Sequence, residues 1–348
     1  MTPNESGSTP NESPKIPEPE QPLRDFFCER YSLGLVLEVR TTDREVFDAT
    51  RRVLGSPFSS QRSLRLVVTI TFDPEGCLAR FSSPDGAPID FSVDDLILAN
   101  DSPDFPFRLI ESNDGWTRLA WKGDDEPALS LRGWECRLRL RDGWRLAIAL
   151  LILNRIYLLR SDAIFFHAAT IDIGGSGVMF IGPKGLGKST TAMALAARGH
   201  ALLGDETACY VPATGMLQPF RRPVGIKPGI RARAVDTALR ERGLQVPADA
   251  LRIDFESVLT TPAPHAVPLR AIVLLEGFAA RPELVAGAGD RGVLARLQPT
   301  ASSLVSAPRT QRVFELARMV SSAQIFHLKP ADPDETAALI ESRLGGKL

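Results

Sequence analysis

The sequence predicts an α/β protein in which a domain built around a phosphate-binding loop follows a smaller α+β or mostly β domain. Residues 177–198 run from a short apolar strand through a glycine-rich loop into a helix rich in Ala, Leu and Met. Residues before about 140 instead alternate short extended segments with turn signals. We therefore expect a tail over 1–22, an N-terminal domain over 23–143 and a P-loop domain over 144–348.

The composition is that of an ordinary globular chain. It has 348 residues, 44% of them hydrophobic and 24% charged, and a formal net charge of −1. Because the chain has no excess of positive charge, we expect neither nucleic acid nor an anionic membrane as a partner. The most apolar run, 146–153, is too short to cross a bilayer, which needs about 20 residues. The four cysteines follow no metal-ligand spacing and suit a reducing, cytoplasmic compartment: Cys28, Cys77, Cys136 and Cys209.

The first 143 residues hold a tail and a set of short elements. Residues 1–22 are rich in Pro, Glu, Ser and Asn, so we expect them to be disordered. A helix is expected over 43–54, with Asp43 as its N-cap. The strands are expected over 35–39, 64–72, 107–111, 117–121 and 129–140. We recognise no group of catalytic residues in this domain, so we expect it to have a role either in substrate recognition or in the structure alone.

The second part begins with a helix over 145–159 that joins the two halves. Residues 163–173 are expected to form one strand, which Gly174–Gly177 turns into the strand before the loop. Residues 279–304 are rich in small residues and show no regular spacing of hydrophobic residues, so we expect them to form a loop. The remaining elements are a strand over 271–275 ending at Glu276, a helix over 309–320, a strand over 325–328 and a helix over 333–344.

The loop matches the pattern G-x-x-x-x-G-K-[ST], with Gly182, Gly187, Lys188 and Ser189 at the fixed positions. Glycines let backbone N–H groups curl around an anion, and the helix N-terminus adds partial positive charge. Lys188 would reach the phosphates of a nucleotide, and the Ser189 hydroxyl would bind Mg²⁺. The expected nucleotide-binding residues are Gly182, Pro183, Lys184, Gly185, Leu186, Gly187, Lys188, Ser189 and Thr190.

Two carboxylates follow the next apolar strand, at Asp205 and Glu206. Ligands of open α/β sheets bind at the carboxyl ends of the strands. A pair of acids there is suited to binding Mg²⁺ and to accepting a hydroxyl proton. Two surface acids in a turn would give the same sequence pattern.

A cationic segment, 219–229, sets Arg221 and Arg222 among prolines and glycines. Such a segment would clamp phosphates or an incoming peptide, or would be a solvated basic loop. The isolated histidines His200, His265 and His327 are expected to be structural.

Residues 163 to about 230 resemble the catalytic domain of the HPr kinase/phosphorylase family. His167 stands upstream of the loop, and residues 198–206, RGHALLGDE, follow the family pattern R-G-H-x-L-x-x-D-D, with Glu206 in place of the second Asp. The surroundings of His167 are similar to an HPr kinase-related branch, some members of which phosphorylate serines of precursor peptides. The resemblance implies a phosphoenolpyruvate-carboxykinase-like P-loop fold, a mixed sheet with helices.

These motifs lead us to expect an ATP-dependent phosphotransferase acting on a serine or threonine hydroxyl of a protein or peptide. In this assignment Lys188 holds the triphosphate and Ser189, with Glu206, holds Mg²⁺. Asp205 receives or orients the hydroxyl proton, and His167 tunes Asp205. A small-molecule kinase on the same scaffold and a nucleotide-sensing switch without transfer remain as alternatives. Whether the chain forms a homo-oligomer is left open.

Overall fold

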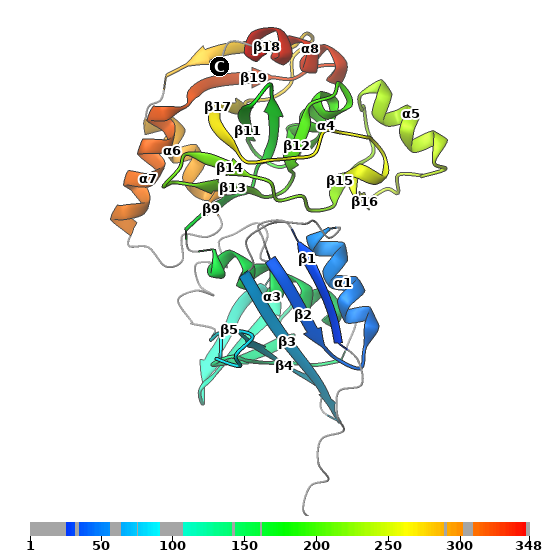
Figure 1. Ribbon diagram of the computed structural model, residues 1–348, viewed down its shortest axis with the longest axis vertical. Helices are drawn as coiled ribbons and strands as arrows, with labels where there is room; N and C mark the ends of the chain where they lie inside the picture. The colour runs from blue at the N-terminus through cyan, green and yellow to red at the C-terminus, as the bar shows by residue number, and fades with distance from the viewer. Residues whose placement is uncertain are drawn as a thin grey trace, which may run out of the picture.

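The structure is a computed structural model that describes residues 26–31, 35–55, 64–74, 76–90, 107–140, 143–160, 162–288, 291–301 and 309–345. It is a mixed α/β protein with two large sheets, one above the other in Figure 1. The predicted tail over 1–22 lies outside the described residues. No helix in the part of the chain that the structure describes has the length and apolar character needed to span a membrane.

Within the described ranges, the first sheet has eight strands in the order β1–β2–β3–β4–β8–β7–β6–β5, in which β2 and β3 run parallel and the other neighbours run antiparallel. The strands are β1 (Phe26–Tyr31), β2 (Leu35–Arg40), β3 (Leu64–Asp73), β4 (Gly76–Ser82), β5 (Phe107–Asn113), β6 (Trp116–Trp121), β7 (Leu129–Arg132) and β8 (Glu135–Leu138). Two helices pack against each other beside this sheet, α1 (Arg44–Leu54) and α3 (Trp144–Leu159).

Helix α1 begins where the sequence predicts. The Asp43 carboxylate accepts a hydrogen bond from the Glu45 backbone N–H at 2.8 Å and pairs with Arg145 of α3 at 2.6 Å. The helix ends at Gly55, whose φ of +87° favours glycine. A Cβ on Gly55 would lie 2.6 Å from the Arg221 carbonyl oxygen, so this position also lets the second half of the chain approach α1 closely.

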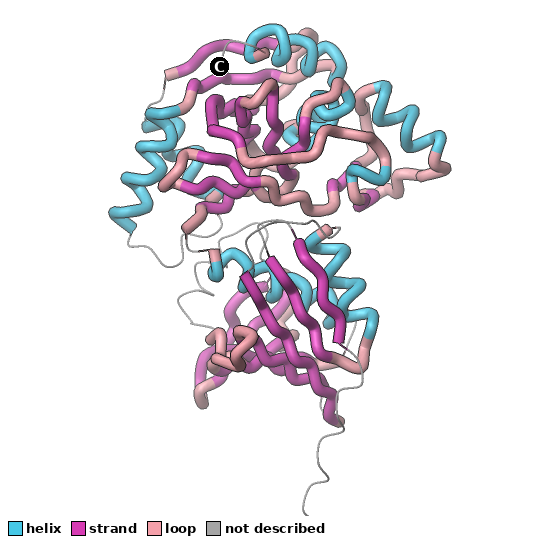
Figure 2. Tube along the Cα trace, in the orientation of Figure 1, coloured by secondary structure: helices cyan, strands magenta, loops and turns pink. Residues whose placement is uncertain are grey.

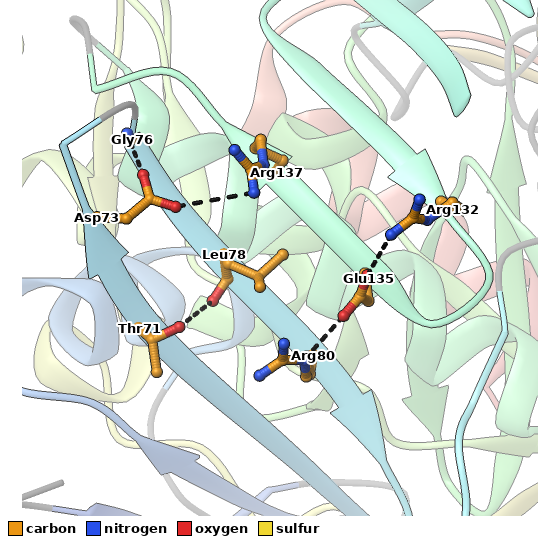
Figure 3. Close-up of polar contacts among 8 residues, drawn as sticks. All are labelled: Thr71, Asp73, Gly76, Leu78, Arg80, Arg132, Glu135 and Arg137. Atoms are coloured by element: carbon orange, nitrogen blue, oxygen red, sulfur yellow. Dashed lines mark hydrogen bonds and ion pairs between the residues drawn. The ribbon is translucent and has the colours of Figure 1, made fainter. Parts of the chain in front are cut away.

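The expected strand over 129–140 is wrong, because the chain turns back at Gly133 and forms the β7–β8 hairpin. Gly133 has a φ of +54°, a conformation that interrupts an extended strand. Figure 3 shows polar side chains along β3, β4 and β8, including Glu135 between Arg80 and Arg132 at 3.0 and 3.3 Å. The two cations, Arg80 first, lower the pKa of Glu135.

The second sheet has nine strands, with the path β12–β10–β11–β17–β14–β13–β9, while β19 pairs with both β17 and β18. They are β9 (Ile164–Phe166), β10 (Ala169–Ile173), β11 (Ser176–Ile181), β12 (Ala201–Gly204), β13 (Ala208–Val211), β14 (Met216–Gln218), β17 (Val267–Leu275), β18 (Glu283–Gly287) and β19 (Gln324–Lys329). A small separate pair is β15 (Val224–Ile226) with β16 (Leu251–Ile253). The sheet is mixed, because β11, β17 and β19 run parallel and the other pairs run antiparallel.

Helices cover the second sheet on both sides (Figures 1 and 2). Alternate residues of β11 enter two cores, with Val178 and Phe180 in one and Met179 and Ile181 in the other. The first core takes α4, α5 and α8, and the second takes α6 and α7. Their bounds are α4 (Lys188–Ala197), α5 (Arg233–Glu241), α6 (Arg291–Leu297), α7 (Arg309–Ser322) and α8 (Pro333–Leu344), with short 3₁₀ turns η2 (Phe255–Ser257) and η3 (Gln298–Thr300).

Helix α8 packs on α4, the helix that follows the phosphate loop. The Glu341 carboxylate of α8 pairs with both Arg198 and His200, which lie just beyond the end of α4. His200, expected to be structural, therefore ties the two helices together, with its Nε2 3.1 Å from Glu341 Oε1.

Two predicted elements differ from the structure. The expected strand over 163–173 is two strands, β9 and β10, which are far apart in the strand order: β9 is the last strand of the path, and β10 is the second, between β12 and β11. The expected loop over 279–304 contains β18, α6 and η3, although residues 289–290 and 302–304 lie outside the described residues. Helices 43–54, 145–159, 309–320 and 333–344 and the other strands are confirmed to within a few residues.

A single core cluster joins the first sheet and its helices to β9, β13 and the segment after β14. Phe165 of β9 is fully buried in it, with its ring centroid 4.5 Å from that of Tyr157 in α3 and 6.1 Å from that of Phe220. The two sheets are therefore held together by apolar packing, although the domain boundary at residue 143 remains a prediction.

Truncating Phe165 should destabilise the whole chain. We expect Phe165→Ala to lower the free energy of unfolding by about 3–5 kcal/mol, because a large buried side chain leaves a cavity. Phe314→Ala in α7 is the control, since its side chain is 75% exposed and its loss should cost less than about 0.5 kcal/mol. Denaturant titration measures both, and equal midpoints for the two variants would contradict this account of the core.

Candidate functional site

The phosphate loop connects the end of β11 to the start of α4. Strand β11 is parallel to β17, so the loop lies at the carboxyl end of the central strands. A Cβ at Gly182 would lie 3.0 Å from the Cβ of Leu275 on β17, so glycine lets the loop leave the sheet close to β17. The first turn of α4 is Lys188, Ser189 and Thr190. The N-cap residue is Gly187, which has no side chain to accept hydrogen bonds from the N–H groups at the start of α4.

Lys188 lies across its own loop. Its side chain is buried, and the ammonium group donates to the Gly182 carbonyl at 2.8 Å and to the Pro183 carbonyl at 3.3 Å. The loop therefore holds a positive charge beside the N-terminus of α4. A cation and a helix N-terminus together suit an anion such as phosphate.

Asp205 lies behind the loop, just past the end of β12. Strand β12 pairs with β10, which in turn pairs with β11, so the strand order brings the acid beside the loop. The Ser189 hydroxyl donates to Asp205 Oδ1 at 2.8 Å. The other oxygen, Oδ2, is buried and has no hydrogen-bond partner among the described residues. A buried carboxylate oxygen without a partner is the position where a cation would be expected.

Burial changes the acidity of Asp205. Loss of water around the carboxylate, followed by the charge of neighbouring Glu206, raises the pKa of Asp205 to about 6. The hydrogen bond from Ser189 acts in the opposite direction. The carboxylate is therefore an unusually strong base for an aspartate and gains from any positive charge placed beside it.

Glu206 has a different environment. It adopts a φ of +63°, a left-handed conformation that is uncommon outside glycine and that occurs at functional sites. Its Oε2 lies 3.6 Å from His167 Nδ1, with both side chains half-buried. The antiparallel pairing of Phe166 with Ala208 explains this contact, because it brings the residue after β9 beside the turn before β13.

The structure brings the predicted residues together but pairs them differently from the sequence-based assignment. That assignment placed Ser189 with Glu206 and His167 with Asp205. The structure instead joins Ser189 to Asp205 and places His167 against Glu206, although the charge of His167 also lowers the pKa of Asp205. The chemical role of each residue remains a prediction.

The two arginines of the proposed phosphate clamp make structural contacts. Arg221 donates to the Leu202 carbonyl at 2.7 Å and pairs with Glu256. Arg222 is buried and donates to the Val53 carbonyl of α1 at 3.1 Å. These contacts give no support to a phosphate clamp, which stays a prediction.

Two residues beside the acids were not identified from the sequence. Thr207 follows Glu206, is fully buried, and its hydroxyl oxygen accepts a hydrogen bond from Arg222 at 2.8 Å. The Tyr157 hydroxyl lies 2.9 Å from the same oxygen. A threonine directly after an acid pair and a tyrosine in an apolar helix were the only available signals, and both are ordinary features of a core.

Oxygen donors suit magnesium at this site. In the described ranges, no three His, Cys, Asp or Glu side chains gather to hold a metal ion. The Ser189 hydroxyl and the Asp205 carboxylate are adjacent, and Mg²⁺ commonly takes one or two protein oxygens and completes its shell with water and phosphate. The residues present therefore fit Mg²⁺ bound together with a nucleotide.

Replacing Asp205 should stabilise the nucleotide-free, Mg²⁺-free chain at neutral pH. Because the pKa of Asp205 in the folded chain is above the ordinary value of 3.8, the ionised carboxylate disfavours folding, and this penalty grows between about pH 4 and pH 6. Asp205→Asn should therefore raise the free energy of unfolding at pH 8 by up to about 3 kcal/mol, and the gain should vanish below about pH 4.

Denaturant titration in chelator at both pH values measures this effect. Asp85→Asn is the control, because a hydrogen bond from Ser83 lowers the pKa of that exposed carboxylate. Its removal should give no gain at pH 8. A loss of stability in Asp205→Asn at pH 8 would show that the ionised carboxylate is well solvated or paired in the fold.

Curated relatives share a short stretch with this chain. HPr kinase/phosphorylase of Prosthecochloris aestuarii is 51% identical over 41 residues, which is 12% of this chain and 12% of the relative. HPr kinase/phosphorylase of Cupriavidus necator is 41% identical over 59 residues, 16% of this chain and 18% of the relative. The chain thus matches less than a fifth of the length of these relatives. No family model matches the chain.

A solved structure of the Hpr(Ser) kinase/phosphatase from Coxiella burnetii aligns with 51% of this chain and 95% of its own, at 13% identity and a TM-score of 0.25. A TM-score this low establishes no common fold. The sequence matches nevertheless confirm the resemblance that the motifs predicted: over a short stretch, this chain is similar to HPr kinase/phosphorylases.

Proposed function

We propose that this chain is an ATP-dependent kinase that transfers a phosphoryl group to a serine or threonine hydroxyl of a protein or peptide. The observation that carries the proposal is the hydrogen bond from Ser189 of the phosphate loop to Asp205, with Glu206 and His167 beside it. A site that only bound a nucleotide would not need a second acid next to the first. The hairpin before the loop and the mixed sheet support a phosphoenolpyruvate-carboxykinase-like P-loop fold as part of the same proposal.

We assign the roles of the two acids from their partners. Ser189 and Asp205 would hold Mg²⁺, which would supply positive charge beside the phosphates. Glu206 would accept the proton of the acceptor hydroxyl, with His167 orienting its carboxylate. This exchanges the roles that the sequence suggested for Asp205 and Glu206, because Asp205 Oδ1 accepts the hydrogen bond of the loop serine and Asp205 Oδ2 is buried without a partner among the described residues.

The reaction is then a simple displacement. The acceptor oxygen forms a bond to the γ-phosphorus, the bond from that phosphorus to the bridging oxygen breaks, and ADP leaves. The hydroxyl proton passes to Glu206. Lys188 and the N-terminus of α4 neutralise charge on the phosphates, and in this reaction class positioning and charge neutralisation supply most of the rate.

The names of the curated relatives indicate which class of acceptor to test first. They are called HPr kinase/phosphorylases, so a protein is the acceptor class that these names favour. We assign substrate recognition to the first sheet and its helices, which form the other half of the shared core.

Removing the loop lysine should abolish transfer. Wild type, Lys188→Ala and the control Lys329→Ala would be incubated with γ-labelled ATP, Mg²⁺ and a library of serine and threonine peptides, beside a panel of sugars. Lys329 is a partly exposed lysine paired with Glu283 on β18, so its removal should leave transfer unchanged. We expect Lys188→Ala to lose transfer by about 10²-fold or more, since it neutralises charge in the transition state.

Three results would contradict the proposal. Unchanged turnover in Lys188→Ala would show that the loop is not the site. Transfer to sugars alone would indicate a small-molecule kinase. Tight ATP binding with no transfer to any acceptor would indicate a nucleotide-sensing switch.

Separate substitutions of the two acids should have separable effects. Glu206→Gln should lower kcat by about 10²-fold or more, the scale for a positioned base, while ATP affinity stays within a few-fold. Asp205→Asn should instead raise the Mg²⁺ concentration needed for half-maximal activity. Calorimetry with ATP and Mg²⁺ titrations of steady-state transfer measure both. The reverse pattern would restore Asp205 as the base.

A further inference from the structure

The acid turn is held from its far side by a buried polar cluster that the proposed mechanism does not use. The cluster consists of Tyr157, Thr207, Arg222 and the Val53 carbonyl. Thr207 is 0% exposed and Tyr157 is 5% exposed, so these polar groups make their hydrogen bonds inside the protein. The cluster lies where α1, α3 and the segment after β14 meet the turn between β12 and β13.

The hydrogen bonds converge on one atom. Arg222 Nη1 donates to Thr207 Oγ1 at 2.8 Å, and the Tyr157 hydroxyl shares a 2.9 Å hydrogen bond with the same oxygen. A threonine hydroxyl has one donor and two acceptor positions, so it can serve both partners at once. Arg222 is fixed in turn, because its Nε donates to the Val53 carbonyl at 3.1 Å.

Apolar packing surrounds the cluster and limits its movement. The ring of Tyr157 lies 4.5 Å from that of Phe165 and 6.4 Å from that of Phe220, centroid to centroid. The backbone of the turn is equally constrained, since a Cβ on Gly204 would lie 2.7 Å from the Thr207 carbonyl oxygen. A hydrogen bond in such a water-poor place is directional and costly to break.

The residue that this cluster adjoins is Glu206, which is in the left-handed conformation. That conformation costs free energy and persists only where the surroundings fix it. Ser189 fixes the residue before Glu206, through Asp205, and the cluster fixes the residue after it. Glu206 therefore lies between two anchored neighbours.

We propose that Thr207, Arg222 and Tyr157 are positioning residues that hold Glu206 in the conformation required for phosphoryl transfer. The α1–α3 side of the molecule would thereby set the geometry of the acid that faces the acceptor. This inference rests on the proposed function for its effect on rate, but its structural part, that the cluster anchors the turn, can be tested without activity.

The test compares two substitutions at one atom. Thr207→Val removes the hydroxyl and keeps the shape, whereas Thr207→Ser keeps the hydroxyl. Thr50→Val is the matched control, because Thr50 is also a fully buried threonine, with its hydroxyl bonded within α1 to the Val46 carbonyl at 3.0 Å. Tyr157→Phe is a milder second variant that removes one hydroxyl and keeps the ring, in case Thr207→Val does not fold.

Two measurements are made on each variant. Hydrogen–deuterium exchange of peptides covering 204–208 reports the turn itself, and steady-state transfer with calorimetry reports kcat, KM and ATP affinity. We expect faster exchange in Thr207→Val and Tyr157→Phe, and a kcat loss of about 10- to 100-fold in Thr207→Val, the scale for a displaced catalytic group. ATP affinity should stay within about two-fold of wild type. Thr207→Ser should recover most of kcat, and Thr50→Val should change stability without changing kcat.

The two proposals fail separately. Unchanged exchange over 204–208 in both Thr207→Val and Tyr157→Phe would overturn the anchoring. Faster exchange with unchanged kcat in an active kinase would overturn the catalytic consequence. A wild-type chain that transfers no phosphate at all would refute the proposed function, while the exchange data would still decide whether the cluster holds the turn.

Discussion

The site depends on one carboxylate, that of Asp205, which is buried directly behind the phosphate loop although burial disfavours its ionised form. Asp205 is 2% exposed, has Glu206 as its neighbour and has one oxygen with no hydrogen-bond partner among the described residues. The ionised form is stabilised by the Ser189 hydroxyl first, and then by the Glu206 backbone N–H and the charge of His167, but burial and Glu206 outweigh them and raise the pKa of Asp205. A protein retains such a group where its charge is needed, because an apolar residue would be more stable there. The surrounding β strands and α4 fix the loop and the acid at this separation.

The parts of the fold that follow from local pattern could be predicted from the sequence. Strand β11 is a continuous apolar run because it is buried on both faces, and α8 carries its own start signal in Asp332 and Pro333. The strand around His167 could not be predicted correctly. Its apolar residues continue on both sides of His167 with no glycine or proline to mark a break, whereas the chain leaves one part of the sheet at Phe166 and enters another at Ala169.

The residues of the site could be identified from the sequence, but their pairing could not. A motif fixes which residues meet the phosphates, yet whether Ser189 bonds to Asp205 or to Glu206 depends on backbone dihedrals at the turn. Arg222 shows the same limit. Its sequence context suggested an exposed cation, whereas its partners are a carbonyl in α1 and a threonine beside the acids. Such contacts join distant segments and leave no trace in local composition.

The packing of α8 on α4 also constrains how the chain folds during synthesis. The end of α4 is fixed through Arg198, His200 and Glu341, and the last of these lies more than 140 positions along the chain from the other two. Contacts of such long sequence separation form late, because closing a long loop costs entropy before any contact compensates. A ribosome-bound chain can complete the first sheet while the helix behind the phosphate loop still lacks its partner. The ability to bind a nucleotide should therefore mature only after α8 has been synthesised, and until then the exposed apolar face of α4 would be a natural contact for chaperones.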